Sequence, residues 1–134
     1  MMLKHLKLVE TILYVDNQNI SSIFYQNIFR QAPSLNVPGI TEFIISDTCK
    51  IALMPNYGIS KILGENMPHP QKGMGIPRCE LYFLVENVQF EYENTLKCGA
   101  TLISPIIDRD WGEKVCYFAD TDGHILAFAE SINP

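Results

Sequence analysis

The strongest constraint on the fold is an internal repeat. Residues 8–15 (LVETILYV) and 80–85 (ELYFLV) both show the β-branched and aromatic enrichment of a strand. Placing Glu10 on Glu80 aligns the apolar positions that follow in the two segments. The chain of 134 residues therefore consists of two related halves, and not of one continuous pattern.

The same elements follow each of these strands. Asn17 and Asn87 come directly after them, and asparagine is a favoured helix N-cap. Apolar residues at i, i+4 and i+8 then predict one helix in each half: Ile20, Phe24 and Ile28, then Val88, Tyr92 and Leu96. Gly99 is predicted to end the second helix as its C′ residue.

Each half closes with a predicted hairpin. The first pairs residues 41–46 with 49–54, and the second pairs 115–119 with 124–130 across a turn that ends in Asp122-Gly123. A further short strand fits between helix and hairpin, at 34–37 and at 100–107. The order β-α-β-β-β, present twice, predicts an α+β fold.

A linker separates the halves. Residues 64–77 contain three prolines and three glycines, which exclude a helix or a central strand. We therefore expect one domain over 1–134, made of module 1–63 and module 78–134. A βαβββ unit cannot close its own sheet, so two units should pair, each with a helix on one face and a concave opposite face. The expected result is a cup-shaped incomplete barrel.

Composition excludes several classes of protein. A hydrophobic fraction of 47% and a charged fraction of 19% are those of a folded globular chain. The net charge of −5 disfavours nucleic acid and anionic membranes as partners and tolerates a cationic ligand. The longest apolar runs are too short for a membrane span, and the N-terminus has no signal-peptide pattern, so we expect a cytoplasmic protein.

The four cysteines carry no metal or disulfide pattern. No two of them form a C-x-x-C pair, and we interpret all four as small buried hydrophobic residues: Cys49, Cys79, Cys98 and Cys116.

Two segments of the second half resemble the signature of the vicinal oxygen chelate superfamily. These are residues 107–113 (IDRDWGE) and 117–126 (YFADTDGHIL); residues 13–16 (LYVD) with Phe24-Tyr25 resemble the family's first strand and helix. This superfamily includes glyoxalase I, extradiol dioxygenases, and fosfomycin- and bleomycin-resistance proteins. The Trp-Gly pair is most similar to the bleomycin-resistance and small glyoxalase-like branch. The resemblance implies a homodimer.

The resemblance also implies four metal-ligand positions. They fall on Glu10, Ala52, Glu80 and Ala127, and alanine cannot ligate a metal. We therefore expect no cofactor and no tightly bound metal. If a divalent metal does bind, Glu10 and Glu80 are its expected ligands.

Strand alternation places several chemically useful side chains on the concave face. Glu10 and Glu80 are the candidate catalytic pair, as acid/base or as counter-ion for a cation; the competing interpretation is two exposed strand glutamates. The ligand-binding candidates are Tyr14, Met54, Tyr82, Trp111 and Tyr117. Trp111 could instead pack on its own sheet, and Tyr117 could fill the barrel. Arg109 and Lys114 could pair with an anionic substrate, although solvated charges are the favoured interpretation.

Three hypotheses for function follow. The first is a protein that binds a small planar or cationic molecule in a concave groove, without a tightly bound metal. The alternative is a glyoxalase-like lyase or isomerase that uses Glu10 and Glu80 as acid/base or as partial ligands of a divalent metal. The third is a non-catalytic partner or sensor module whose cup is filled by its own side chains. Whether the protein is an enzyme stays open at this point.

Overall fold

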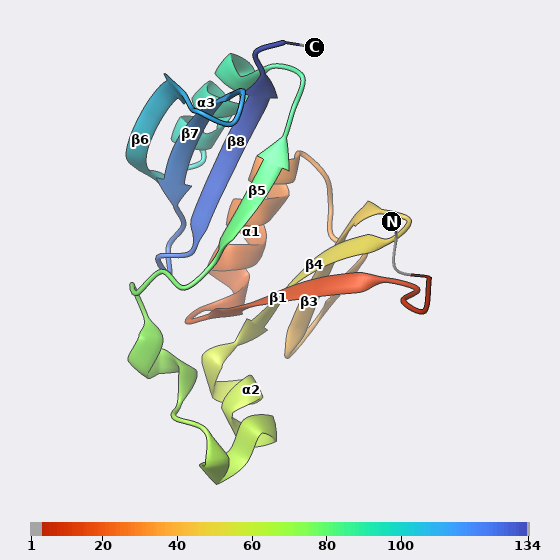
Figure 1. The fold of residues 1–134 in the computed structure, drawn as a ribbon. Coiled ribbons are helices and arrows are strands. Elements are labelled where there is room, and N and C mark those ends of the chain that lie inside the picture. Colours follow the sequence, from red (N-terminus) through yellow and green to blue (C-terminus); the bar gives the residue numbers. More distant parts are fainter. Residues whose placement is uncertain (1–3, 134) are drawn as a thin grey trace. The chain divides into compact units, whose positions relative to one another are not determined.

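The computed structural model describes residues 4–133 (Figure 1). The chain divides into two compact units, the first ending at Gly73 and the second beginning at Met74. The first unit contains β1 (Val9–Val15), α1 (Gln18–Phe29), β2 (Leu35–Val37), β3 (Ile40–Ser46), β4 (Cys49–Pro55) and α2 (Asn56–Leu63). The second contains β5 (Glu80–Leu84), α3 (Val88–Lys97), β6 (Thr101–Asp108), β7 (Glu113–Ala119) and β8 (Ile125–Ser131).

Each unit holds one mixed four-stranded sheet, and the two sheets have the same topology. Their strand orders are β1-β4-β3-β2 and β5-β8-β7-β6. The first strand of each unit runs parallel to the last one, while the other neighbours are antiparallel. This arrangement confirms the predicted α+β class and the two βαβββ modules. The module boundaries at 63 and 78, and the closure into a cup, stay predictions.

The helix ends form where the sequence predicts them. The side-chain oxygen of Asn17 accepts a hydrogen bond from the backbone N–H of Ile20 at 3.0 Å, and Asn87 accepts one from Phe90 at 3.0 Å. Each bond satisfies a donor that the first helical turn leaves free. Gly99 follows α3 with φ of +88°, a left-handed conformation that glycine adopts without strain.

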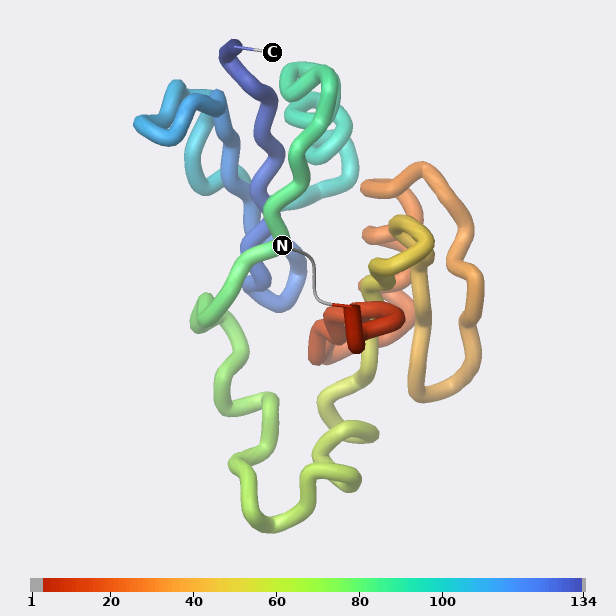
Figure 2. Tube along the Cα trace, turned by 45° about the vertical axis from the view of Figure 1, so that its right-hand side comes forward, coloured from red at the N-terminus to blue at the C-terminus, as the bar shows by residue number. Residues whose placement is uncertain are grey.

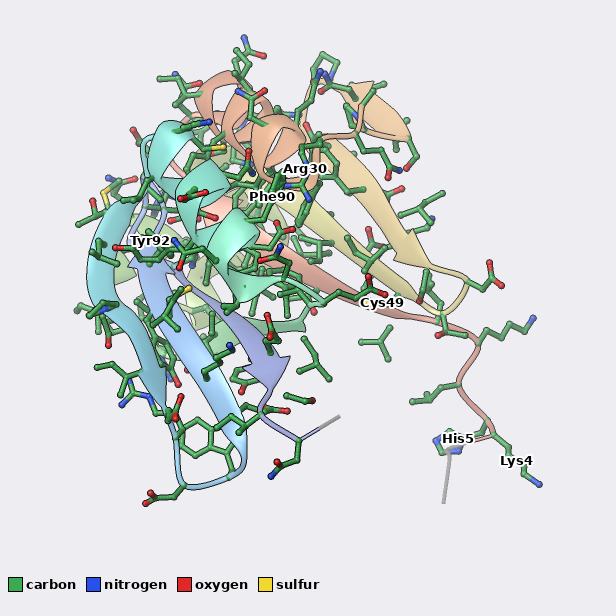
Figure 3. All side chains as sticks on the ribbon, turned by 90° about the horizontal axis from the view of Figure 1, so that it is seen from above. Lys4, His5, Arg30, Cys49, Phe90 and Tyr92 are labelled. Atoms are coloured by element: carbon green, nitrogen blue, oxygen red, sulfur yellow. The ribbon has the colours of Figure 1, made fainter. Side chains whose placement is uncertain are left out.

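Helices α1 and α3 each cover one face of the sheet in their own unit, and this face forms the core of the unit. In the first unit α1 packs on β3 and β4, with Tyr25 and Phe43 almost fully buried. In the second unit α3 packs on β6, β7 and β8. Tyr92 of α3, labelled in Figure 3, packs against Phe118 of β7 with ring centroids 5.6 Å apart. The opposite face of each sheet is the one that α1 or α3 does not cover. We call it the helix-free face.

The segment after β4 contains an element that the sequence analysis missed. Helix α2 directly follows Pro55 and buries Ile59. It is short, it contains Gly58, and its N-terminus has no side-chain cap, so the usual helix signals are lacking. Residues 64–77, the predicted linker, have two 3₁₀ turns at Gly64–Asn66 and Pro70–Gly73 and no α-helix, as their prolines and glycines predict. Figure 2 follows this segment as the light-green part of the tube.

The interpretation of the cysteines is wrong for three of the four. All are free thiols, but only Cys116 is buried; Cys79 is exposed, and Cys49 and Cys98 are partly exposed. Cys79 lies in the irregular segment directly before β5. Among the helices of residues 4–133, none is both long enough and apolar enough to cross a membrane.

Candidate functional site

The helix-free face of the second sheet carries two tyrosines on either side of an alanine. Tyr82 of β5 pairs in register with Ala127 of β8, which in turn pairs with Tyr117 of β7. Residues that pair in register point to the same side of a sheet. Tyr117 packs against Val115, Ala127 and Ala129. Because alanine side chains end at Cβ, they leave room for this ring to lie on the sheet.

A hydrogen-bonded chain joins Tyr82 to the loop between β6 and β7. The indole Nε1 of Trp111 donates to the Tyr82 hydroxyl at 2.9 Å, and that hydroxyl donates to Oε1 of Glu113. Burial and the bond to Glu113 raise the pKa of Tyr82, while the bond from Trp111 lowers it. The phenol is therefore a stable proton donor at neutral pH. The Trp111 side chain remains 57% exposed, so its ring is available to a ligand.

Backbone bonds in this loop bring Trp111 to the sheet. The N–H of Arg109 donates to the carbonyl of Glu113 at 2.8 Å, and the N–H of Gly112 donates to Arg109 at 3.1 Å. Gly112 has φ of +88°, which closes the turn. The N–H of Ile132 donates to the Gly112 carbonyl at 3.0 Å, which ties the loop to the residue after β8.

Arg109 lies over one of the tyrosines. Its guanidinium carbon is 5.4 Å from the centroid of the Tyr117 ring, a cation–π distance. Its Nη2 donates to Oγ of Ser104 at 3.0 Å, while its Nε is buried and has no hydrogen-bond partner within residues 4–133. We name Tyr82, Arg109, Trp111, Glu113 and Tyr117 the hairpin cluster, because three of its residues lie in or beside the β6–β7 hairpin loop.

The helix-free face of the first sheet carries a different group. Glu10 of β1 pairs in register with Lys50 of β4, and Nζ of Lys50 lies 3.6 Å from Oε1 of Glu42 of β3. A hydrogen bond with Glu42, then burial, raises the pKa of Glu10, and Lys50 lowers it. Oε2 of Glu10 is buried and has no hydrogen-bond partner among the described residues. A carboxyl group whose pKa is raised takes up a proton more readily than an ordinary glutamate.

The structure brings three predicted site residues together. Tyr82, Trp111 and Tyr117 all belong to the hairpin cluster. Tyr14 and Met54 pair in register on the first sheet and are partly buried.

The two candidate catalytic glutamates belong to different units. Glu10 contacts Glu42 within its own sheet. Glu80 is exposed at the start of β5. The pairing of Glu10 with Glu80 stays a prediction.

Sequence reasoning missed Glu42 and Glu113 and undervalued Arg109. Glu113 is four residues before Tyr117 on β7, so the two-residue strand period places both on the same face. Glu42 of β3 pairs in register with Ala52 of β4, so these two residues also share the helix-free face. Arg109, interpreted as solvated, stacks on Tyr117 instead. Lys114 forms an ion pair with Glu130 at 3.4 Å.

The donor set does not fit the metal centre that the superfamily resemblance implies. Ala52 pairs with Ile12 and Glu42, and Ala127 lies between two tyrosines, so neither position offers a ligand atom. Glu130 accepts a hydrogen bond from the Val88 N–H at 2.9 Å, which turns it toward α3. Within the part of the chain that the structure describes, no three His, Cys, Asp or Glu side chains form a metal-binding group.

Comparison with known proteins identifies one family. The family model for the glyoxalase-like domain matches residues 8–133. An uncharacterized protein of Mycobacterium bovis is 24% identical over 123 residues, which cover 90% of this chain and 80% of that protein. An uncharacterized protein of Mycobacterium tuberculosis is also 24% identical, over 90% of this chain and 72% of its own length.

Solved structures share the fold. A glyoxalase-related enzyme from Fulvimarina pelagi has a TM-score of 0.78 at 21% identity, covering 92% of this chain and 87% of that one. A glyoxalase/bleomycin resistance protein/dioxygenase family enzyme from Burkholderia phytofirmans has a TM-score of 0.73 at 14% identity, covering 91% and 96%. A fosfomycin resistance protein from Listeria monocytogenes has a TM-score of 0.69 at 20% identity, covering 92% of each chain. The match to the glyoxalase-like domain family confirms the predicted resemblance to the vicinal oxygen chelate superfamily.

Proposed function

Because this chain belongs to the glyoxalase-like domain family, we propose that it binds a small planar or cationic molecule on the hairpin cluster, without a tightly bound metal. Its relatives in that family carry many chemistries on one scaffold, so the side chains decide the function. We also propose that it acts as a homodimer.

The observation that carries this proposal is the hydrogen-bonded chain from Trp111 through Tyr82 to Glu113. It holds an exposed indole in one orientation beside a carboxylate. A rigid aromatic surface beside a negative charge suits a planar ligand with a cationic or donor group, because stacking and ion pairing then act on the same molecule. The net charge of −5 also favours a cationic ligand, because the negatively charged protein attracts it.

The single tryptophan provides a direct test. In a ¹H–¹⁵N correlation spectrum the protein gives one indole N–H signal, that of Trp111. We expect 2-phenylethylamine to shift this signal saturably, and Tyr82→Phe to weaken binding by removing the partner of the indole. Tyr57→Phe is the matched control, because Tyr57 is 69% exposed on α2, outside the hairpin cluster. No shift with any planar amine would refute the proposal.

A lyase or isomerase activity is the second candidate, favoured by the raised pKa of Glu10, whose first cause is the neighbouring Glu42 side chain. A carboxyl group that stays protonated above its usual pH range can act as a general acid or base. Glu80 stays the predicted second catalytic group. The test is solvent deuterium exchange into the C–H positions of a bound ligand, followed by NMR. Exchange that Glu10→Gln abolishes supports catalysis, and exchange unaffected by that variant argues against it.

A further inference from the structure

Neither charge of the hairpin cluster has an ionic partner among the described residues. Within residues 4–133, no carboxylate lies at ion-pair distance from Arg109, and no lysine or arginine lies at that distance from Glu113. Lys114, next to Glu113 on β7, forms its ion pair with Glu130 instead. On β7 the charge of Lys114 is therefore paired within the protein, while the charge of the adjacent Glu113 is available to a ligand.

These two charged side chains are nevertheless held in place. The guanidinium of Arg109 is fixed by the Tyr117 ring and by the Ser104 hydroxyl, and the carboxylate of Glu113 is fixed by the Tyr82 hydroxyl. Fixing a long side chain costs rotamer entropy, which a ligand then need not supply. Both charged groups are therefore already oriented before a ligand binds.

The environment of Arg109 favours an anion in particular. Its Nε is buried and makes no hydrogen bond with the part of the chain that the structure describes, so this nitrogen has lost its contact with water without a replacement. Nη1 makes no hydrogen bond with the described residues. A planar anion that accepts hydrogen bonds from the guanidinium would offset this desolvation, and a carboxylate matches the geometry of the guanidinium fork.

The two charges lie on the same face. Tyr82, which binds Glu113, and Tyr117, which supports Arg109, flank Ala127 across adjacent strands. Strands in a sheet are about 4.8 Å apart, so the two rings belong to positions about 10 Å apart. A molecule the size of an aromatic amino acid spans this distance.

We propose that the ligand of the hairpin cluster is amphoteric: an aromatic ring on Trp111 and Tyr82, an anionic group on Arg109, and a cationic or donor group on Glu113. This inference rests on the proposed function and narrows its ligand class. It predicts that a compound with both charges binds more tightly than compounds with only one of them.

Four matched probes test the inference: phenylalanine, 3-phenylpropionate, 2-phenylethylamine and 2-phenylethanol, which carry both charges, the negative one, the positive one and none. Dissociation constants come from the shift of the Trp111 indole signal. We expect phenylalanine to bind tightest and 2-phenylethanol weakest. Arg109→Gln should weaken phenylalanine and 3-phenylpropionate at least tenfold and leave 2-phenylethylamine unchanged. Glu113→Gln should weaken phenylalanine and 2-phenylethylamine and leave 3-phenylpropionate unchanged.

Two control variants separate contact from overall charge. Lys114→Gln removes one positive charge from the neighbourhood of β7, as Arg109→Gln does, and Glu130→Gln removes one negative charge; these two side chains form an ion pair with each other. Both should leave the order of the four probes unchanged. Arg109→Lys keeps the charge and loses the planar fork, so its affinity for 3-phenylpropionate should lie between those of wild type and Arg109→Gln. Circular dichroism checks that each variant is folded.

The outcomes distinguish this inference from the proposed function. If 2-phenylethylamine binds, but 3-phenylpropionate binds no better than 2-phenylethanol and Arg109→Gln changes nothing, the inference is overturned and the proposed function stands. If none of the four probes shifts the indole signal, both are overturned. If Lys114→Gln weakens the anionic probes as much as Arg109→Gln does, overall charge explains the effect and the inference is wrong.

Discussion

The turn between β7 and β8 contains a close backbone contact that sets a measurable limit on substitution. The N–H of Gly123 donates to the Asp120 carbonyl at 3.1 Å, and Gly123 has φ of +88°. The N–H of Gly75 donates to the Asp122 carbonyl at 3.1 Å. A Cβ on Gly123 would lie 2.7 Å from Cα of Gly75 and 3.2 Å from its nitrogen. A methyl group there would displace the Gly75 backbone.

Gly123→Ala should therefore destabilise the fold in two ways. A left-handed conformation costs an alanine about 1–2 kcal/mol. Relieving the overlap with Gly75 adds about 1–3 kcal/mol, as for other overpacked sites. Gly99 is a matched control, because it has the same φ of +88° and its Cβ would meet nothing within 4 Å. Gly99→Ala should cost only the first amount, and the difference between the variants isolates the backbone contact.

Urea denaturation followed by circular dichroism measures both variants. We expect the midpoint to fall for each and to fall further for Gly123→Ala, with an unchanged m-value. For a chain of this length the extra destabilisation corresponds to about 3–4 °C in Tm per kcal/mol. Equal destabilisation by the two substitutions would show that the contact between Gly75 and Gly123 does not constrain the turn.

Three further predictions concern single side chains. Because the pKa of Glu10 is raised, the stability that its protonated form contributes is fully present below the ordinary pKa of 4.5 and is lost as the pH rises through the raised pKa. Glu10→Gln, whose side chain does not ionise, should flatten this part of the stability–pH curve, as measured by urea unfolding. Thr41→Val removes a buried hydroxyl that bonds three other side chains, and should cost about 1–3 kcal/mol in thermal denaturation. Burial raises the pKa of Cys116 to about 11, so in native protein iodoacetamide should modify exposed Cys79 first and leave Cys116 unmodified, as read by peptide mass spectrometry.

Local signals account for most of what was predictable in the fold. Asn17 and Asn87 cap their helices through bonds to residues three positions ahead, so the few residues on either side determine them. The strands are predicted to within one or two residues because their alternation is itself local. Helix α2 was not predicted, because its helicity depends on burying Ile59 and not on a local cap.

The candidate site depended on tertiary structure to a much larger degree. The sequence shows that Tyr82, Trp111 and Tyr117 are aromatic. Strand alternation also predicts the face of the sheet to which the two tyrosines point. The bond between Trp111 and Tyr82 spans 29 residues, and it forms only because the β6–β7 hairpin turns its loop back onto the sheet. The raised pKa of Glu10, which Glu42 and burial cause, likewise requires strands β1, β4 and β3 to lie side by side.

The sequence by itself determined the repeat, the helix caps and the loss of ligand atoms at Ala52 and Ala127, because each of these is a property of residue type and local spacing. Only the tertiary structure decided which charges are neutralised. Lys114 lies beside Glu113 in the chain but pairs with Glu130 on the face that α3 covers, since adjacent residues of a strand point to opposite faces. Within the described part of the chain, Arg109 and Glu113 have no ionic partners on the helix-free face, and this difference makes the face a candidate binding surface.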